Sequence, residues 1–525
     1  MIMNKAIDIG RKSASGSFQL FIGVSVSTAI MAVGAIILAR LMSPEEYGLY
    51  TVALIPAYMM ILFRDWGVSS AITRYVANLR AENKEEEIRD VITAGLFFMV
   101  TTGLVLTILS MLIANLIATH IFNRPEATSL IMIASTTIFS GAFFMASQSS
   151  FIGFERMKLN SFIAIIQASA KSVIAPVLVY IGYSVLGAIL GYALSFLIAG
   201  MIGTILLYTL FLKKLKKRNP YKLMLTKTLR KMLNFGVPLS ISSILTGFLI
   251  QFYSFVMAMY CSDLMIGNYQ VAMQFATILT FFTIPISTTM FPAFSKINPQ
   301  KEHELLQTVF AASVKYTTII LIPAATAVIA LSRPMITTLF GEKWTYAPFF
   351  LSLYVISNLL AAFGSLSLPN FLAGLAETKI LMKLNLLSFC FGVPLAFLMV
   401  PNFGIVGVIL GGLFATFPKL ILGLTWIWRH YRVKVNFNSS IRILFSSGIS
   451  AAITYHLINL IGTSEWIKLI IGAAMFLALY LTITPLIGAV NKTDIENLRA
   501  MLSDMGIISK IINSPLSFAE KIAKP

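Results

Sequence analysis

Long apolar runs recur along the whole chain and constrain its fold more than any other feature. A run of roughly 18–25 apolar residues is long enough, as a helix, to cross the roughly 30 Å hydrocarbon core of a bilayer. Of the 525 residues, 57% are hydrophobic and only 12% are charged, and the mean hydropathy is +0.84. The sequence therefore predicts an all-α polytopic membrane protein. It does not fit an outer-membrane barrel, whose strands alternate over about ten residues.

The spacing of the runs predicts about fourteen transmembrane helices. The first run, 18–38, is too long for the apolar core of a signal peptide, so we expect a retained span. The longest loop between the expected helices is 65–90, and it contains no D-x-D motif. The expected helices are 17–39, 47–64, 91–117, 128–151, 161–182, 184–212, 235–258, 267–292, 310–332, 346–369, 378–400, 404–430, 441–461 and 467–489.

The segment 213–231 is the most polar part of the chain. It reads KKLKKRNPYKLMLTKTLRK and contains nine Lys or Arg residues and no acid. Cytoplasmic loops of membrane proteins carry an excess of such residues, which predicts a cytoplasmic linker and, with an even number of spans, cytoplasmic N and C termini. The net charge of +19 is explained by the same excess of Lys and Arg in cytoplasmic loops, so it does not indicate that the protein binds nucleic acid. We expect the linker to face anionic membrane lipid.

The two halves of the chain repeat at an offset of about 220 residues. The motif G-x-Y-x-V-A occurs at 48–53 and again at 267–272. Two further pairs, at 153 and 374 and at 187 and 407, occupy matching places in the two halves. Six helices in each half would insert in the same sense, so we expect two lobes related by a pseudo-twofold along the membrane normal. For the paired glycines, close helix packing is the alternative role.

The repeat divides the chain into five parts. We expect an N-terminal six-helix lobe at 1–212, a basic linker at 213–234 and a C-terminal six-helix lobe at 235–430. Two added helices follow at 431–490, and the tail at 491–525 is cytoplasmic and amphipathic. The apolar stripe of this tail fits a helix in the membrane interface and equally a helix packed on the bundle.

Charged residues inside or at the ends of the expected helices are the candidate substrate-binding residues. A charge at the bilayer centre costs about 3 kcal/mol, so such residues tend to face a polar cavity. Lys171 and Lys419 lie within apolar helices, and the alternative for both is that the side chain reaches toward the interface. Arg64 and Asp65 close the second helix, where they serve as a cavity-mouth binding point or as an anchoring pair. Arg11 precedes the first helix and fits either a phosphate contact or a topology anchor.

Several classes of activity have no support in the sequence. No Asp or Glu lies well inside any expected helix, which disfavours a cation antiporter with buried carboxylate ion sites. The chain has no P-loop and no D-x-D in its longest loop, so we expect neither ATP hydrolysis nor glycosyl transfer. Cys261 and Cys390 have no metal-ligand spacing. We predict a transporter that is not an enzyme and needs no metal or cofactor.

Two segments near the start of the chain resemble a known family. The turn LMSPEEYGLY at 41–50 is similar to the turn after the first helix of polysaccharide-export flippases. RDWGV at 64–68, followed by RYVA at 74–77, resembles the segment that closes their second helix. The chain resembles the polysaccharide transporter branch of the multidrug/oligosaccharidyl-lipid/polysaccharide exporter superfamily, which includes O-antigen (Wzx-type) flippases.

This resemblance implies a substrate and a mechanism. Members of this branch move an oligosaccharide on polyprenyl phosphate or diphosphate from the cytoplasmic to the outer leaflet, with helices 1, 2, 7 and 8 lining the cavity. We therefore expect a polyprenyl-linked oligosaccharide and membrane lipids as ligands, and a polysaccharide polymerase or glycosyltransferases as candidate partners. The alternatives are a flippase of a lipid-linked peptidoglycan precursor and a multidrug or cation antiporter of the same fold.

Overall fold

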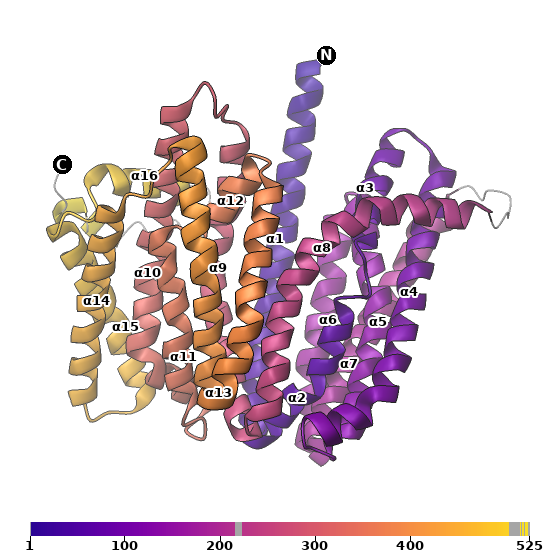
Figure 1. Cartoon of the computed structure of the whole chain (residues 1–525), viewed down its shortest axis with the longest axis horizontal. Helices are drawn as coiled ribbons and strands as arrows, with labels where there is room; N and C mark the ends of the chain where they lie inside the picture. The colour runs from indigo at the N-terminus through magenta and orange to yellow at the C-terminus, as the bar shows by residue number, and fades with distance from the viewer. Residues whose placement is uncertain (1, 216–222, 503–514, 516, 519, 523–525) are drawn as a thin grey trace. The chain divides into compact units, whose positions relative to one another are not determined.

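The computed structural model consists of helices and turns and contains no strand among the residues that it describes. These are 2–215, 223–502, 515, 517–518 and 520–522. For 2–18, 223–224, 242, 277–289, 291–292, 498 and 500–502, the description covers the backbone alone. The all-α class predicted from the sequence is confirmed (Figure 1).

The chain divides into two compact units, Met1–Gly267 and Asn268–Pro525. The first unit contains α1 (Ile2–Leu41), α2 (Pro44–Ile61), α3 (Val68–Ala81), α4 (Glu85–Leu116), α5 (Ala127–Gly153), α6 (Met157–Leu178), α7 (Ser184–Leu207) and α8 (Leu223–Tyr260), with the π-helical turns η1 (Ile117–Ile121), η2 (Val179–Tyr183) and η3 (Tyr208–Leu212). Helix α9 (Asp263–Ser295) begins in the first unit and continues into the second.

Small residues hold the helices of the first unit close together. Helix α1 packs along α6, where the Ser161 Oγ donates to the carbonyl of Gln19 at 3.2 Å and the Ser172 Oγ donates to that of Ile30 at 3.0 Å. Between α6 and α7, a Cβ added at Gly191 would meet the backbone and the Cβ of Ala175. These contacts are typical of helix packing in membranes, where close backbone approach replaces the hydrophobic effect.

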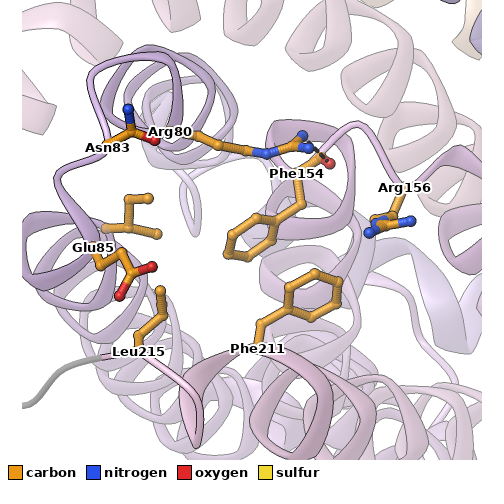
Figure 2. Close-up of a pocket in the computed structure, with 8 residues that line it drawn as sticks. Arg80, Asn83, Glu85, Phe154, Arg156, Phe211 and Leu215 are labelled. Atoms are coloured by element: carbon orange, nitrogen blue, oxygen red, sulfur yellow. Dashed lines mark hydrogen bonds between the residues drawn. The ribbon is translucent and has the colours of Figure 1, made fainter.

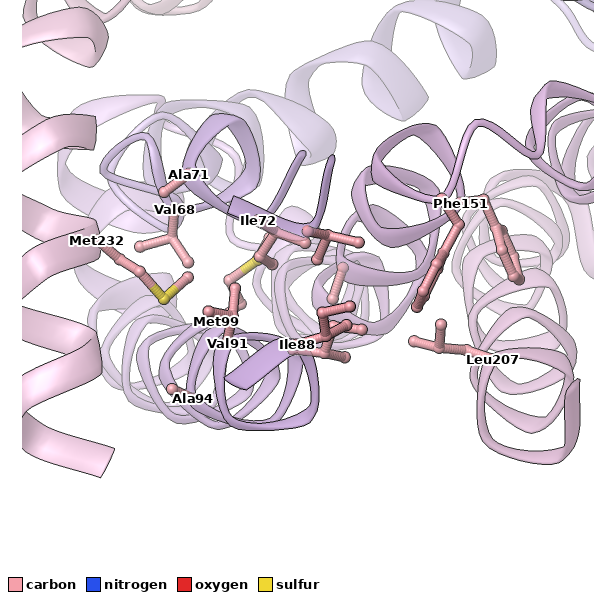
Figure 3. Close-up of a cluster of buried hydrophobic side chains, with 14 of the residues drawn as sticks. Val68, Ala71, Ile72, Ile88, Val91, Ala94, Met99, Phe151, Leu207 and Met232 are labelled. Atoms are coloured by element: carbon pink, nitrogen blue, oxygen red, sulfur yellow. The ribbon is translucent and has the colours of Figure 1, made fainter. Parts of the chain in front are cut away.

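A short amphipathic helix, α3, occupies the segment that the sequence analysis assigned to a loop at 65–90. Its residues Val68, Ile72 and Val76 are fully buried against α4, α5 and α8 (Figure 3). Met99 of α4 and Met232 of α8 are part of the same buried cluster. The loop prediction was wrong because α3 is too polar and too short to resemble a span, yet it buries one apolar face.

Two long helical stretches reverse direction within themselves. Between α6 and α7, the backbone leaves the helical region at Gly182 (φ 108°) and Ser184 (φ 44°), and the two helices then pack on each other. In the second unit, α13 (Thr378–Tyr431) breaks at Gly404 (φ 56°, ψ −131°). Residues 34 positions apart would be separated by about 50 Å in one straight helix. The 2.8 Å hydrogen bond from Lys419 to Asn385 shows that α13 folds back at this break.

In the second unit, α10 packs against α11, α14 and α15. The helices of this unit after α9 are α10 (His303–Phe340), α11 (Ala347–Val355), η4 (3₁₀, Ile356–Phe363), α12 (Ser367–Gly374), α13, α14 (Phe437–Leu460), α15 (Glu465–Leu486) and α16 (Lys492–Leu502). Asp494 of α16 accepts an ion pair from Lys315 at 2.6 Å, and Ile495 is buried with residues of α10. The described part of the tail therefore packs on the helices of this unit.

Nine helical segments of the described chain are long and apolar enough to cross a membrane. A tenth is added if α11–η4 and α12, which meet at a bend of 48°, form one span. Because most of these segments expose apolar side chains, such as Leu112 and Ile181, bilayer lipid provides their surroundings. The protein is therefore a multi-pass membrane protein.

Candidate functional site

Two cations and two tyrosines form a cluster inside the first unit. Lys171 lies in the middle of α6, and its Nζ is 4.7 Å from the ring centroid of Tyr192 in α7. Tyr192 packs edge to face on Tyr58 of α2, with the ring centroids 6.1 Å apart. Tyr192 also interacts electrostatically with Arg64, which follows α2. We call Lys171, Tyr192, Tyr58 and Arg64 the basic–tyrosine cluster.

Helix α2 sets the position of Tyr58. It begins with a capping box, in which the Ser43 Oγ accepts the N–H of Glu46 at 3.1 Å and the Glu46 carboxylate accepts the N–H of Ser43 at 2.8 Å. The same carboxylate accepts a 2.6 Å bond from Ser184, which ties the start of α2 to the reversal between α6 and α7. These bonds fix α2 relative to the helices that carry Lys171 and Tyr192.

Arg64 is buried, with 5% of its surface exposed. Its Nη1 donates to the carbonyl of Ile138 in α5 at 3.0 Å, and its Nη2 lies 3.4 Å from the Sδ of Met145. Gly141 makes room for the guanidinium, because a Cβ there would lie 2.6 Å from Nη1. The buried Nε has no hydrogen-bond partner within the described chain. An unsatisfied buried donor is costly, so this edge of Arg64 favours an added acceptor.

Asp65 does not pair with Arg64. Its two carboxylate oxygens accept the N–H and the hydroxyl of Ser69, at 2.8 Å and 2.6 Å. These bonds satisfy donors in the first turn of α3, as an N-terminal cap does. The anchoring role considered for an Arg64–Asp65 pair therefore belongs to Asp65 alone, while Arg64 extends to α5.

Lys171 is the second cation of the cluster and is partly buried. Neither it nor Arg64 forms an ion pair within the described residues. Other cations of the chain do find acids: Arg124 lies 2.7 Å from Asp263, and Lys468 lies 2.9 Å from Glu465. Arg64 still interacts electrostatically with the neighbouring Asp65, whose oxygens are taken up by Ser69. Two positive charges without an ion pair in the described chain make the cluster suited to an anion.

The other two predicted cations lie elsewhere. Lys419, in the second unit, is partly buried and donates a 2.8 Å hydrogen bond to Asn385 across the reversal of α13. Arg11 belongs to α1, but its side chain lies outside the described residues. The structure thus brings Arg64 and Lys171 into one cluster and places Lys419 in the second unit.

A separate cavity of about 200 Å³ opens at the ends of α3 and α5 (Figure 2). Its aromatic wall is the stacked pair Phe154 and Phe211, whose centroids are 4.3 Å apart. Arg80 donates to the carbonyl of Phe154 at 2.6 Å and pairs with Glu155 at 3.2 Å. Because Arg80 already has acceptors and Glu85 also lines the cavity, we assign the functional site to the basic–tyrosine cluster.

Sequence reasoning missed the two tyrosines. Tyr47, Tyr50 and Tyr58 fall at i, i+3 and i+11, which places them on one helical face of α2. That pattern was available in the sequence, but it did not identify Tyr192, 134 positions beyond Tyr58, as the partner. The described residues contain no group of three or more His, Cys, Asp or Glu that fits a metal ion.

Comparison with known proteins gives the class. The lipid II flippase MurJ, in an inward closed conformation, has a similar fold, with a TM-score of 0.70 over 89% of this chain and 98% of that one, at 15% identity. The lipopolysaccharide biosynthesis protein WzxC of Escherichia coli is 24% identical over 79% of this chain and 81% of its own length. The probable low-salt glycan biosynthesis flippase Agl15 of Haloferax volcanii is 22% identical over 52% of this chain, and the match spans 57% of that protein.

The fold is that of the multidrug/oligosaccharidyl-lipid/polysaccharide exporter superfamily, a class of membrane transporters rather than enzymes. Residues 37–348 match the polysaccharide biosynthesis protein family. The chain belongs to this family, because the match covers more than half of its residues. The resemblance noted at residues 41–50 and 64–77 is thereby confirmed.

Proposed function

We propose that the protein moves a polyprenyl phosphate- or diphosphate-linked oligosaccharide from the cytoplasmic to the outer leaflet by alternating access. The observation that carries the proposal is the pair of cations, Arg64 in the turn after α2 and Lys171 in α6, which are buried or partly buried and form no ion pair among the described residues. A charge in such surroundings costs about 3 kcal/mol, and a bound anion offsets that cost.

The chemistry of the cargo matches the cluster. A lipid phosphate is anionic, and arginine and lysine donate charge-assisted hydrogen bonds to its oxygens. Two donors are available to bind the phosphate. One is the Nε of Arg64, which has no hydrogen-bond partner in the described chain, and the other is the Nζ of Lys171, which contacts only an aromatic face among the described groups. In this proposal the isoprenoid tail stays in lipid while the sugars occupy a cavity of the carrier.

The relatives support a glycan cargo. WzxC acts in lipopolysaccharide biosynthesis and Agl15 in glycan biosynthesis, according to their names. The alternative cargo is a lipid-linked peptidoglycan precursor, as the name of MurJ suggests, and it would use the same two cations. A multidrug or cation antiporter is disfavoured, because the charges inside the first unit are positive and a cationic drug would be repelled.

The proposed architecture comprises fourteen spans. It counts α1, α2, α4 to α10, the bent α11–α12 segment, both halves of α13, α14 and α15. The reversals at Gly182 and Gly404, which make two spans from each long stretch, support this count. We further propose lobes at 1–212 and 235–430, joined by the linker 213–234 and followed by 431–490 and a cytoplasmic tail at 491–525. Both termini are cytoplasmic in this proposal.

The proposed roles differ among the candidate residues. Arg64 and Lys171 contact the phosphate headgroup, with Tyr58 and Tyr192 beside them. Lys419 contributes a cation from the second lobe, held by Asn385. Arg11 attracts the headgroup before it enters. Asp65 acts indirectly, because its bonds to Ser69 hold the turn that presents Arg64.

Replacement of Lys171 or Lys419 by alanine tests the proposal. We expect each variant to lose export of the surface glycan while the amount of protein in the membrane stays unchanged. Normal export in both variants would remove these residues from the site. A reporter fused at Asn219 tests the orientation separately. It should behave as cytoplasmic, and an external signal there would reverse the topology.

A further inference from the structure

The first turns of α2 and α9 cross at two glycines in equivalent positions of the repeat. Gly48 opens the first G-x-Y-x-V-A motif and Gly267 the second. A Cβ added at Gly48 would overlap the backbone of Asp263, and one added at Gly267 would overlap the carbonyl of Pro44. Only glycine at both positions permits this close approach of the start of α9 to the start of α2 within the first unit.

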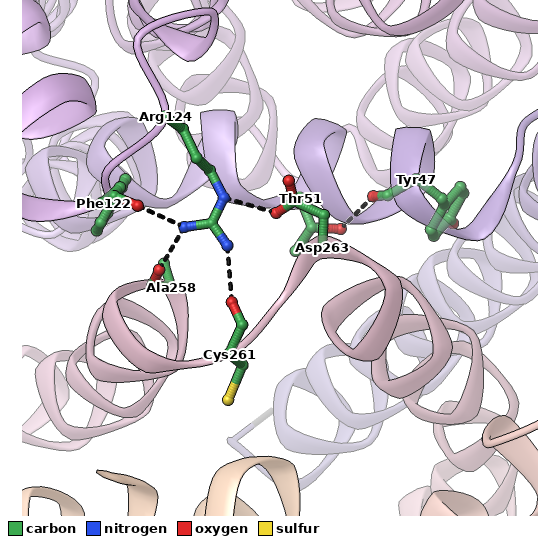
Figure 4. Close-up of polar contacts among 7 residues, drawn as sticks. All are labelled: Tyr47, Thr51, Phe122, Arg124, Ala258, Cys261 and Asp263. Carbon is green, nitrogen blue, oxygen red and sulfur yellow. Dashed lines mark hydrogen bonds and ion pairs between the residues drawn. The ribbon is translucent and has the colours of Figure 1, made fainter.

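Arg124 holds the same crossing from the turn between α4 and α5 (Figure 4). Its Nε donates to the Asp263 carboxylate at 2.7 Å. Its Nη1 donates to the carbonyls of Phe122 at 2.8 Å and Ala258 at 2.6 Å, and its Nη2 to that of Cys261 at 2.7 Å. The guanidinium thus joins the α4–α5 turn to the end of α8 and the start of α9.

This crossing lies at the end of the first unit away from the basic linker. Helix α8 starts within the linker at Leu223 and ends at Tyr260. Its segment Ser243–Tyr260 is long and apolar enough to cross a bilayer, and it lies between the linker and the Arg124 contacts along the chain. The Arg124 contacts and the linker are therefore on opposite sides of the membrane.

We propose that the Gly48–Gly267 crossing and the Arg124 contacts form a latch that closes the carrier on the side away from the basic linker and opens to release cargo. This inference rests on the proposed transport function. The polar partners suit a contact that breaks repeatedly, because the carbonyls of Ala258 and Cys261 belong to a helix end and can bond water once Arg124 leaves. Glycines present no interlocking side chains, so the two helices can separate without rearranging rotamers.

The native Cys261 provides a reporter of the latch. It is 8% exposed, and its carbonyl accepts one of the Arg124 bonds. With Cys390 replaced by serine, Cys261 is the single thiol of the chain. A membrane-impermeant maleimide added from the side away from the linker then measures how often the latch opens, with no substrate present.

We expect Arg124→Ala to raise the labelling rate of Cys261 at least about tenfold, because one charge-assisted hydrogen bond alone corresponds to such a factor in an equilibrium. Gly48→Ala should raise it as well, through the overlap with Asp263. The matched control is Arg333→Ala, since Arg333 is exposed in α10 and forms no ion pair in the described part of the chain. Each variant is first checked for monodisperse behaviour in detergent.

Labelling of both variants at the rate of the Arg333→Ala control would overturn the latch, whatever their transport activity. If Arg124→Ala does not fold, Gly48→Ala decides alone. Raised labelling in a protein whose unaltered form moves no lipid-linked oligosaccharide would refute the proposed function and leave the latch standing. The two inferences therefore fail by different measurements.

Discussion

Replacement of Lys171 by methionine separates a binding role from a structural one. Methionine has a similar length and no charge, so the packing of α6 is kept. Among the described groups, the Lys171 Nζ contacts only the Tyr192 ring, 4.7 Å from its centroid. Such a desolvated cation–π contact stabilises by about 2 kcal/mol, whereas the charge itself costs about 3 kcal/mol inside the membrane. These contributions nearly cancel, so the variant should be as stable as the original protein or slightly more stable.

The effect on ligand binding should be much larger. A hydrogen bond from a charged donor contributes about 1.5–3 kcal/mol, which corresponds to about 10- to 150-fold in affinity. We expect this loss when binding of a short-chain isoprenyl diphosphate to the purified Lys171→Met variant is measured by calorimetry. Lys171→Arg, which keeps the charge, should recover part of the affinity.

Lys158→Met is the matched control, because Lys158 lies on the same helix, is exposed, and has no ion pair among the described residues. It should bind the diphosphate normally. The reasoning is refuted if Lys171→Met binds as tightly as the control. The reasoning is also refuted if Lys171→Met unfolds at a clearly lower temperature than the original protein, because the Lys171 charge would then stabilise the fold.

Three further results are expected. Asp65→Ala should lower the free energy of unfolding by about 1 kcal/mol, because α3 loses its cap, and thermal unfolding that matches the unaltered protein would contradict this. Gly404→Ala should cost about 1–3 kcal/mol and reduce the yield of folded protein, since φ 56° with ψ −131° suits only glycine. Gly412→Ala is its control, because open space surrounds that position. Burial raises the pKa of the Cys261 thiol to about 11, so its labelling should still increase about tenfold per pH unit between pH 8 and 10; a plateau near pH 9 would contradict this.

Hydropathy alone predicted the class of the fold. It predicted the residues at which the helices begin and end less accurately. Helix α4 begins at Glu85, six residues before the expected start at 91. Its first turn consists of Glu85, Glu86 and Glu87, whose charges favour a helix N-terminus but lower the hydropathy. Helix α3 was missed for a related reason, because a helix buried on one face is recognised by its periodicity and not by its average hydropathy.

The candidate site was predicted in part. Arg64 and Lys171 were identified because isolated charges in apolar segments are rare. Tyr192, which contacts Lys171 and interacts electrostatically with Arg64, depends on the packing of α2, α6 and α7, which no local pattern encodes. The separation of Arg64 from Asp65 also depends on three-dimensional structure: adjacent residues in a turn can point apart, and here one extends to α5 while the other caps α3.

The most direct test of the account is leaflet exchange in proteoliposomes that contain the purified protein and a polyprenyl diphosphate-linked oligosaccharide. Sugar that becomes accessible to an external glycosidase or lectin measures the movement. We predict protein-dependent movement that Lys171→Met reduces and Lys158→Met leaves unchanged. Absence of movement, together with uptake of a lipophilic cation by the same vesicles, would contradict the assignment of an anionic, lipid-linked cargo.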